Sequence, residues 1–366
     1  MQDVRIARWA HTLVHYSLAL QPGEILAIES TPGAAPLIEA GYQEALNIGA
    51  YPIPFLNLET LDELLLQQGN EQQLNWLSPL HKRLAEKVDA RLFIHSSENI
   101  RLLVSVDPAR AIKRRQAMQA IYQIYHARER AEGFRWCMTL YPTQAYAQNA
   151  NMLLREFEEF VFATCFLNDP DPIASWKAIS TEQQRLIDWL RGHDKVHILA
   201  VDTGSDPFNQ RRPFINEDGI RNFPSGEFFT SPLENSANGV ICFFPSTYDG
   251  RRVEGVRLVF RDGKVVEASA SQEEDYLQQM LNLDKGSRYL GEFAFGNNAG
   301  ITRLAHHILF DEKMGGTIDM ALGNSLAGTY GINQSAIHWD MVCDLRSAGE
   351  VRVDGTLFLK DGKFMA

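Results

Sequence analysis

The pattern with the clearest chemical potential in this 366-residue chain is His338-Trp339-Asp340, which lies inside the apolar run QSAIHWDMVCDL. In a strand, residues two positions apart project from the same face, so we expect His338 and Asp340 to lie side by side. An imidazole nitrogen beside a carboxylate oxygen supplies half of a coordination sphere for zinc, iron or manganese. The same pair also occurs as a structural hydrogen bond, so by itself it is weak support for a metal.

Three acidic residues of the C-terminal half lie in apolar or tightly turned surroundings. Glu227 follows Pro-Ser-Gly, Glu292 lies in YLGEFAFG, and Asp319 lies in GGTIDMALGN. An unpaired charge among apolar residues is costly, and a cation would offset the mutual repulsion of converging acids. Each acid alone could instead be a surface residue in a turn or a partner of the backbone. Their convergence is what favours a metal site.

Motifs of several other catalytic classes do not occur in the sequence. We find no P-loop, no G-x-G-x-x-G fingerprint, no G-x-S-x-G elbow and no H-E-x-x-H helix. The iron/2-oxoglutarate oxygenases also use His-x-Asp, but they need a second ligand histidine downstream, and no histidine follows His338. The carboxylates and the His-x-Asp pair remain as the candidates for catalysis.

Strands and helices alternate in the N-terminal half of the chain. Thr31-Pro32 predicts the start of a helix that ends at Gly49, and this helix stands between apolar strands at 24–30 and 51–58. A strand, a helix and a second strand make a βαβ unit. Further buried strands are expected at 90–97, 134–142 and 195–202. We therefore predict an α/β N-terminal domain with a mainly parallel sheet over residues 1–200.

The pattern changes after residue 202 to alternating apolar runs that are separated by Gly, Asp-Gly and Asn. The segments RDGK and KDGK are typical of hairpin turns. Helices are expected at 272–283 and 300–312. We predict an α+β C-terminal domain with antiparallel strands over residues 201–366, and this domain carries the candidate metal site.

The charge balance limits the classes of partner. Lys and Arg number 35 against 46 Asp and Glu, which gives a net charge of -11. This excess of acid disfavours nucleic acid or an anionic membrane as the main partner, because both need a positive field. The basic segment VDPARAIKRRQAMQAIYQIYHARERAEGF is interpreted as an amphipathic helix with a solvated basic face rather than as a nucleic-acid patch.

Cysteine usage and hydropathy indicate the compartment. The four cysteines form no C-x-x-C pair, which excludes a zinc ribbon or a small disulfide scaffold and predicts reduced thiols. The N-terminus lacks the uninterrupted apolar region of a signal peptide. No window approaches the ~18 consecutive apolar residues of a membrane span. We therefore predict a soluble, cytoplasmic protein.

Four stretches, INEDGIRNFPSGEFFTSP, YLGEFAFG, LFDEKMGGTIDMALGN and NQSAIHWDMV, occur in this order over most of 215–345. In combination they resemble the M29 family of metal-dependent aminopeptidases, of the aminopeptidase T type. The resemblance implies a hydrolase that removes N-terminal residues from short peptides through a metal-activated water. It also implies a homodimer.

In that family two divalent ions share a cluster of acids and histidines. Position by position, Glu227 matches the acid of the P-x-G-E motif, and Glu312 matches the acid of a D-E-N segment. Glu292 matches the L-G-E acid between the metals, where it would also position the water or shuttle its proton. The ligand set that the resemblance implies is Glu227, Glu292, Glu312, Asp319, His338 and Asp340.

The sequence departs from the family pattern at two positions. The family usually has a histidine where this chain has Asp319, and an acid there makes the site richer in oxygen. Among manganese, magnesium, cobalt, zinc and iron, this change favours manganese, magnesium or iron. The family also has a tyrosine seven residues later, where this chain has Leu326. Tyr330 is close in sequence and is the candidate to replace it as a catalytic residue.

Two alternatives to the peptidase remain open at this point. A ring-cleaving dioxygenase acting on 2,5-dihydroxypyridine is similar to this family in its C-terminal half and binds one iron through histidines and an H-x-D aspartate. That enzyme carries a histidine where this chain keeps Glu292, which favours the peptidase. The other alternative is a non-catalytic relative whose metal site has decayed at Asp319 and Leu326.

Overall fold

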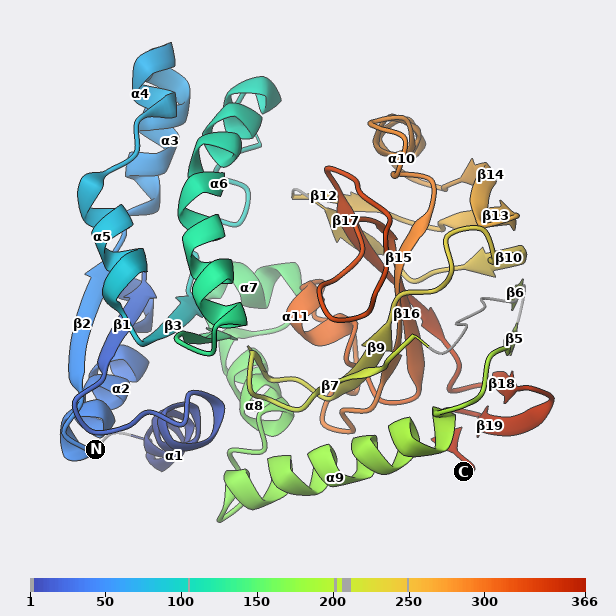
Figure 1. Ribbon diagram of the computed structural model, residues 1–366, viewed down its shortest axis with the longest axis horizontal. Coiled ribbons are helices and arrows are strands. Elements are labelled where there is room, and N and C mark those ends of the chain that lie inside the picture. Colours follow the sequence, from blue (N-terminus) through green and yellow to red (C-terminus); the bar gives the residue numbers. More distant parts are fainter. Residues whose placement is uncertain (1–2, 105, 201–202, 206–211, 249) are drawn as a thin grey trace. The chain divides into compact units, whose positions relative to one another are not determined.

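The computed structural model describes residues 3–104, 106–200, 203–205, 212–248 and 250–366. It divides into two compact units (Figure 1). Unit 1 comprises Met1–Ile173 and Gly219–Phe223, and unit 2 comprises Ala174–Asp218 and Pro224–Ala366. Unit 1 is α/β with a parallel sheet and unit 2 is built on antiparallel sheets, which confirms the predicted fold class. The expected domain boundary after residue 200 stays a prediction.

Unit 1 contains a five-stranded parallel sheet in the order β2-β1-β3-β4-β8. Its strands are β1 (Ile25–Ser30), β2 (Tyr51–Leu56), β3 (Ala90–His95), β4 (Arg135–Leu140) and β8 (Asn222–Phe223). Eight helices of the described part surround it: α1 (Val4–Thr12), α2 (Ala35–Asn47), α3 (Glu59–Gln68), α4 (Glu71–Asn75), α5 (Pro79–Lys87), α6 (Pro108–Arg130), α7 (Gln144–Asn149) and α8 (Leu154–Thr164).

Helices cover both faces of this sheet, as its continuous apolar runs require. On one face, Ala27 of β1 packs in a cluster with Ile121 and Tyr125 of α6. On the other face, α2 lies close enough that a Cβ on its Gly41 would contact Ile28 of β1. In the part of the chain that the structure describes, no helix combines the length and apolar character needed to span a membrane.

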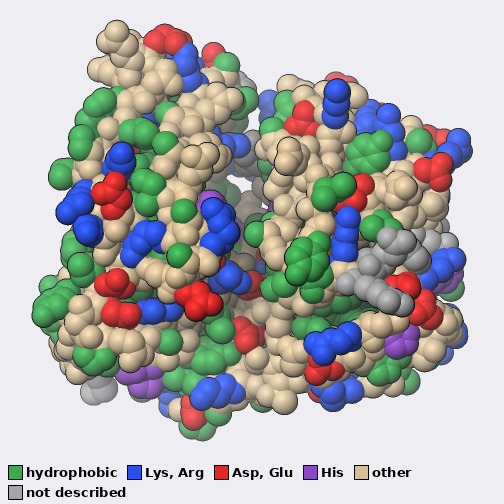
Figure 2. Space-filling model, viewed as in Figure 1, with side chains coloured by type: hydrophobic (Ala, Val, Ile, Leu, Met, Phe, Trp, Pro, Cys, Tyr) green, Lys and Arg blue, Asp and Glu red, His purple; other side chains and the backbone are tan. Residues whose placement is uncertain are grey.

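The basic segment forms α6, and its arginines have a structural task. Arg110, Arg114 and Arg128 donate to backbone carbonyls at the C-terminal ends of α3, α4 and α5 respectively. The last carbonyls of a helix have no partner within the helix, so these guanidinium groups satisfy them. Part of the basic face that we expected to be solvated therefore forms hydrogen bonds within unit 1. Figure 2 shows basic and acidic side chains interspersed over the visible face.

Unit 2 holds two larger sheets. The eight-stranded one has the order β14-β13-β10-β6-β5-β18-β19-β20, and the five-stranded one has the order β17-β16-β15-β9-β7. The first consists of β5 (Val196–Ala200), β6 (Thr203–Ser205), β10 (Gly239–Cys242), β13 (Arg257–Arg261), β14 (Lys264–Ser269), β18 (Glu350–Val353), β19 (Thr356–Lys360) and β20 (Lys363–Phe364). The second consists of β7 (Ile215–Glu217), β9 (Glu227–Thr230), β15 (Leu290–Gly296), β16 (Thr317–Gly323) and β17 (His338–Asp344).

The remaining elements of unit 2 are short, apart from one long helix. A separate ribbon is formed by β11 (Ser246–Tyr248) and β12 (Arg251–Val253). The helices are α9 (Pro172–Leu190), α10 (Glu274–Leu281) and α11 (Ile308–Asp311). The long helix α9, whose first two residues fall in unit 1, contributes Leu186, Ile187 and Leu190 to the apolar core of unit 2.

One strand of the N-terminal half belongs to the other unit. The strand expected at 195–202 is β5, which pairs antiparallel with β18 in unit 2, so assigning it to the parallel sheet was wrong. Residues 201 and 202 lie outside the described residues. In β5, Val196 and Ile198 are buried and alternate with less buried neighbours, as in a strand with one covered face. The fifth strand of the parallel sheet is β8.

The two Asp-Gly segments form the expected hairpins. Asp262 and Gly263 have φ of 48° and 80°, and Asp361 and Gly362 have φ of 47° and 75°. Two successive residues with positive φ are typical of the type I′ turn that matches strand twist. The helix expected at 300–312 is much shorter, because His306 has a φ of 55° and His307 is extended at the start of α11.

Strict alternation along β15, β16 and β17 separates two kinds of side chain. One face carries large apolar residues, which pack in the core between the two sheets of unit 2. The other face carries small residues and acids. The apolar set is Phe293, Phe295, Ile318, Met320, Leu322, Trp339, Met341 and Cys343. Asp319 in TIDMALG and Glu292 in LGEFAFG therefore both lie on the face of the sheet that points away from this core.

Candidate metal centre

The register of three strands places the predicted ligands together. Ala321 of β16 pairs with Glu292 of β15 on one side and with Asp340 of β17 on the other. Asp319 lies two residues before Ala321 and so shares its face. Glu227 of β9 pairs with Gly296, four residues after Glu292 on β15. The small side chain of Ala321 lets the acids on both sides approach each other.

His338 is held as a metal-binding histidine would be. Its Nδ1 lies 2.7 Å from the backbone oxygen of Asn324, so Nδ1 carries the proton and donates it there. Its Nε2 lies 3.0 Å from Oε2 of Glu292 and 3.2 Å from Oδ1 of Asp340. A carbonyl that fixes the Nδ1–H tautomer leaves the Nε2 lone pair free for a cation. Potential ligand atoms of Glu292, His338 and Asp340 all lie within 4.8 Å of one another.

Glu227 and Glu312 share a buried lysine instead. Lys313, which follows Glu312, is fully buried, and its Nζ lies 3.1 Å from Oε1 of Glu227 and in contact with Oε1 of Glu312. Sequence reasoning missed this residue. The signal was present, because the chain reads D-E-K where the resembled family has D-E-N.

Asp319 carries a buried polar atom that a cation would satisfy. Its side chain is 1% exposed, and its Oδ1 has no hydrogen-bond partner among the described residues. A buried carboxylate oxygen without a partner is costly. A backbone hydrogen bond to Oδ1, the alternative left open by the sequence, is therefore missing. A divalent ion bound by Glu292, His338 and Asp340 would find in Asp319 a further oxygen ligand on the same face.

Burial and neighbouring charges shift the pKa values of Glu292, Asp319 and His338. Burial raises the pKa of Glu292 to about 7, although the hydrogen bond from His338 opposes the rise. Burial, together with the charges of Asp340 and Glu312, raises the pKa of Asp319 well above its ordinary range. Burial alone would lower the pKa of His338, but Asp340 and Glu292 raise it well above its usual value. A cation is thus the group that would let these acids stay ionised.

Lys313 lowers the pKa values of the neighbouring acids, but burial outweighs it. Burial raises the pKa values of Glu227 and of Glu312 to about 8, while the ammonium of Lys313 pulls both down. Burial works to raise the pKa of Asp340 as well, but His338 outweighs it and holds that pKa below its ordinary value.

Asp311 is another buried acid that the motifs did not indicate. It accepts a hydrogen bond from the backbone N–H of Ala305 at 2.7 Å, and burial raises its pKa to about 7. With Asp340 it lines a small open hollow, whose walls include Leu304 and Val342. Asp311 thus fixes the loop that forms one wall beside the candidate ligands.

Tyr330 is the one predicted site residue that the structure does not bring to the cluster. Its φ is 60°, and it is 76% exposed to solvent. The buried hydroxyl nearest to it in sequence is that of Thr329, which meets the Ser231 hydroxyl at 2.6 Å. A catalytic role for Tyr330 stays a prediction.

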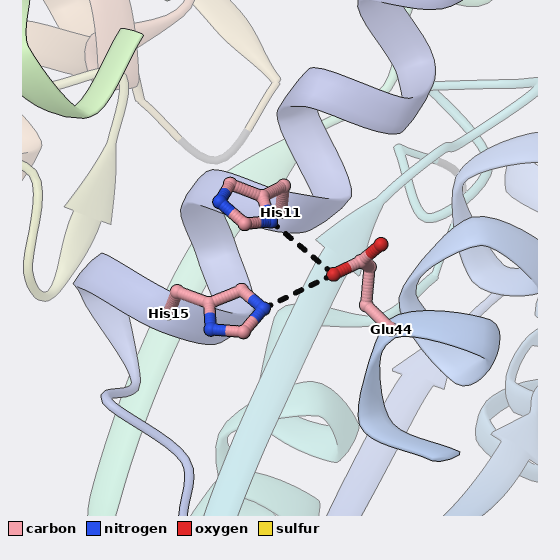
Figure 3. Close-up of side chains that lie close together, drawn as sticks. All are labelled: His11, His15 and Glu44. Carbon is pink, nitrogen blue, oxygen red and sulfur yellow. Dashed lines mark hydrogen bonds and ion pairs between the residues drawn. The ribbon is translucent and has the colours of Figure 1, made fainter. Parts of the chain in front are cut away.

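A second group of three potential ligands lies in unit 1 (Figure 3). His11 of α1 and His15, in the π-helical turn Leu13–Ser17, face Oε2 of Glu44 on α2. The distances from this oxygen are 3.3 Å to Nδ1 of His11 and 3.1 Å to Nε2 of His15. Both imidazoles are solvent-accessible, and the contacts are those of surface ion pairs. We assign this group no catalytic role.

Comparison with known proteins identifies the family. A family model described as thermophilic metalloprotease (M29) matches residues 2–364. The chain belongs to the M29 family. Membership in this metalloprotease family implies dependence on divalent metal.

Individual M29 relatives match over most or about half of the chain. Aminopeptidase 2 of Geobacillus stearothermophilus is 28% identical over 99% of this chain and 95% of its own length. Aminopeptidase T of Thermus aquaticus is 28% identical over 55% of each chain. The solved structure of wild-type AmpT from Thermus thermophilus shares the fold, with a TM-score of 0.84, 20% identity and 99% of each chain covered. These relatives favour the peptidase interpretation and give no support to the dioxygenase.

Replacing Gly291 should disturb the centre without touching a ligand. A Cβ at Gly291 would lie 2.3 Å from the backbone oxygen of Asn324, the same oxygen that holds His338. We expect Gly291→Ala to lower the free energy of unfolding by about 1–3 kcal/mol through overpacking and to weaken metal binding. Denaturant unfolding and metal analysis measure the two effects. Gly133→Ala is the control, because its Cβ would meet nothing closer than 3.7 Å. Unchanged stability and metal content in Gly291→Ala would contradict this account.

Asp319→Asn should separate stability from metal affinity. It removes a buried charge that repels Asp340 and Glu292, so the metal-free protein should become more stable. It also removes a ligand oxygen, so metal affinity should fall by about tenfold or more. Calorimetric titration with Mn²⁺ and thermal unfolding measure both quantities. Asp319→His should shift preference toward zinc or cobalt. Asp344→Asn, which only breaks the ion pair with Arg346, is the control. Full metal affinity in Asp319→Asn would end the ligand assignment.

Proposed function

We propose that the protein is a metal-dependent aminopeptidase that hydrolyses N-terminal residues of short peptides. The observation that carries the proposal is the arrangement of Glu292, His338 and Asp340, with the Nδ1–H of His338 fixed on a backbone oxygen. Membership in the M29 family and relatives named as aminopeptidases support the same activity.

The chemistry needs a cation and a proton carrier. A divalent ion in this centre would polarise the scissile carbonyl and acidify a water molecule. Glu292 is suited to accept the proton of the attacking water and to return it to the departing amine. Its carboxylate lies beside His338, at 3.0 Å from Nε2, on the face where the ion and its water would be held. His338 and Asp340 would hold the ion, and the backbone oxygen of Asn324 keeps the His338 ring in place.

The surplus of acid in the centre suits a free peptide N-terminus. The ammonium of Lys313 offsets only one of the surrounding carboxylates, so the centre remains negative beyond what a single divalent ion neutralises. A protonated α-amino group is attracted to such a field, whereas an acetylated one carries no charge. The oxygen-rich ligand set, with Asp319 in place of histidine, favours manganese, magnesium or iron over zinc and cobalt. The family resemblance implies two ions in such a centre.

The activity can be tested with paired peptides. Protein loaded with Mn²⁺, Mg²⁺, Co²⁺, Zn²⁺ or Fe²⁺ should cleave unblocked dipeptides, and N-acetylated versions should be cleaved at least about a hundredfold more slowly, since the charged amine is lost. Chelation should abolish turnover, and Glu292→Gln should lower kcat by about 10²–10⁴-fold because it cannot carry the proton. Mass spectrometry of the products gives the rates. Equal cleavage of blocked peptides, or oxygen uptake with a dihydroxypyridine in place of hydrolysis, would overturn the proposal.

We also propose a cytoplasmic homodimer. The family resemblance supports the dimer, and a sequence whose four cysteines form no C-x-x-C pair supports a reducing compartment. Apolar side chains exposed in unit 1 offer area for an interface; they include Leu58, Leu61, Trp76 and Leu80. Light scattering at micromolar concentration should give about twice the chain mass of 41.4 kDa, as a two-fold dimer requires. A monomer mass would refute the dimer.

A further inference from the structure

Lys313 is the residue of the centre that the proposed reaction leaves unexplained. Its side chain is fully buried, which is rare for lysine unless a partner holds the charge. Its ammonium lies between Oε1 of Glu227, at 3.1 Å, and Oε1 of Glu312. Two carboxylates in contact with one ammonium are the kind of partners that allow a lysine to stay charged when it is buried.

The backbone around Lys313 allows it little freedom to leave. Its N–H donates to the oxygen of Phe310 at 3.1 Å, and its own oxygen accepts from the N–H of Asn298 at 2.9 Å. The carboxamide of Asn298 in turn donates to the oxygen of Ser225 at 2.8 Å, just before Gly226 and Glu227. The backbone of Lys313 and the backbone just before Glu227 are therefore both held by Asn298.

An ammonium in this place competes directly with a divalent ion. An ion bound to Oε1 of Glu227 would lie ~2.0–2.6 Å from that oxygen. Nζ of Lys313 lies only 3.1 Å from the same oxygen, so both cations would be crowded onto one acid and would repel each other. The residues that fit a divalent ion are Glu292, His338 and Asp340, whereas Glu227 and Glu312 already have a cation of their own.

We propose that Lys313 replaces one of the two divalent ions that the family resemblance implies, so that this chain binds a single ion at Glu292, His338 and Asp340. The inference rests on the proposed function only in taking Glu292, His338 and Asp340 as the ligands of a divalent ion. It concerns the number of ions, which is measurable without turnover.

The departures from the family motifs at Asp319 and at Lys313 compensate each other in charge. Asp319 adds a negative charge where the family usually has a neutral histidine, and Lys313 adds a positive charge where D-E-N has asparagine. The charge of the ligand shell is therefore the same after both changes. A centre that had merely decayed would have no reason to keep such a balance in a buried position.

The number of bound ions tests the proposal. The chain carrying His11→Ala and His15→Ala serves as parent, because the surface group in Figure 3 could hold an additional ion. After loading with Mn²⁺ and desalting, elemental analysis should find one ion per chain in the parent. Adding Lys313→Asn should raise this to two, since Glu227 and Glu312 lose their own cation. Lys313→Arg, which keeps the charge, should stay at one, and His338→Ala should lose the parent's ion.

Paramagnetic resonance gives a second readout. One isolated Mn²⁺ gives an uncoupled spectrum in the parent, and two neighbouring ions in Lys313→Asn should give a coupled one. Two ions in the parent would overturn the role of Lys313 and leave the aminopeptidase proposal intact. No gain in a folded Lys313→Asn chain would also overturn it. Absence of any ion from the parent, with no peptide cleavage, would instead contradict the proposed function.

Discussion

Burial of like charges is the constraint on which the rest of unit 2 depends. Glu227, Glu292, Asp319 and Asp340 are held on one face of a single sheet, with Glu312 beside them, and each is largely withdrawn from solvent. Water is not available to screen their repulsion, so protons or cations must balance it. Burial raises the pKa values of Glu227, Glu292 and Glu312 for this reason. Metal binding and the stability of unit 2 are therefore coupled.

The sheet tolerates this face because its other face is a strong core. Phe293 and Phe295 alternate with Glu292 and Ala294 along β15, so every buried acid on one side has large apolar neighbours anchored on the other. Small residues on the acidic face then let the side chains converge. Ala321 stands between Glu292 and Asp340, and Gly291 leaves room for the carbonyl of Asn324 that orients His338.

Lys313 divides the acids into two groups with different chemistry. Glu227 and Glu312 have a permanent cation that cannot exchange, whereas Glu292, Asp340 and His338 have an exchangeable place for an ion. With one divalent ion in place of two, the centre keeps a surplus of negative charge, which suits a protonated peptide amine. It also keeps a fixed positive charge beside the reaction, which a flexible surface lysine could not provide.

The sequence by itself determined the features that depend on local periodicity. Alternation in TIDMALG and HWDMVCD gave the strands and the shared face of His338 and Asp340, because the side-chain period of a strand is two. Asp-Gly pairs predicted two hairpins, because few other residues accept two positive φ values. The family motifs indicated the acids of the centre and the divalent metal.

Only the tertiary structure decided which charged side chains contact each other. Lys313 lies 86 positions from Glu227 in the chain, and no local pattern predicts that the two meet. The same holds for β5, whose apolar run suits either sheet until its partner strand is known, and for the helix expected at 300–312, which a left-handed His306 shortens. Long-range pairing and buried electrostatics are set by the whole fold, so they are absent from any single segment of sequence.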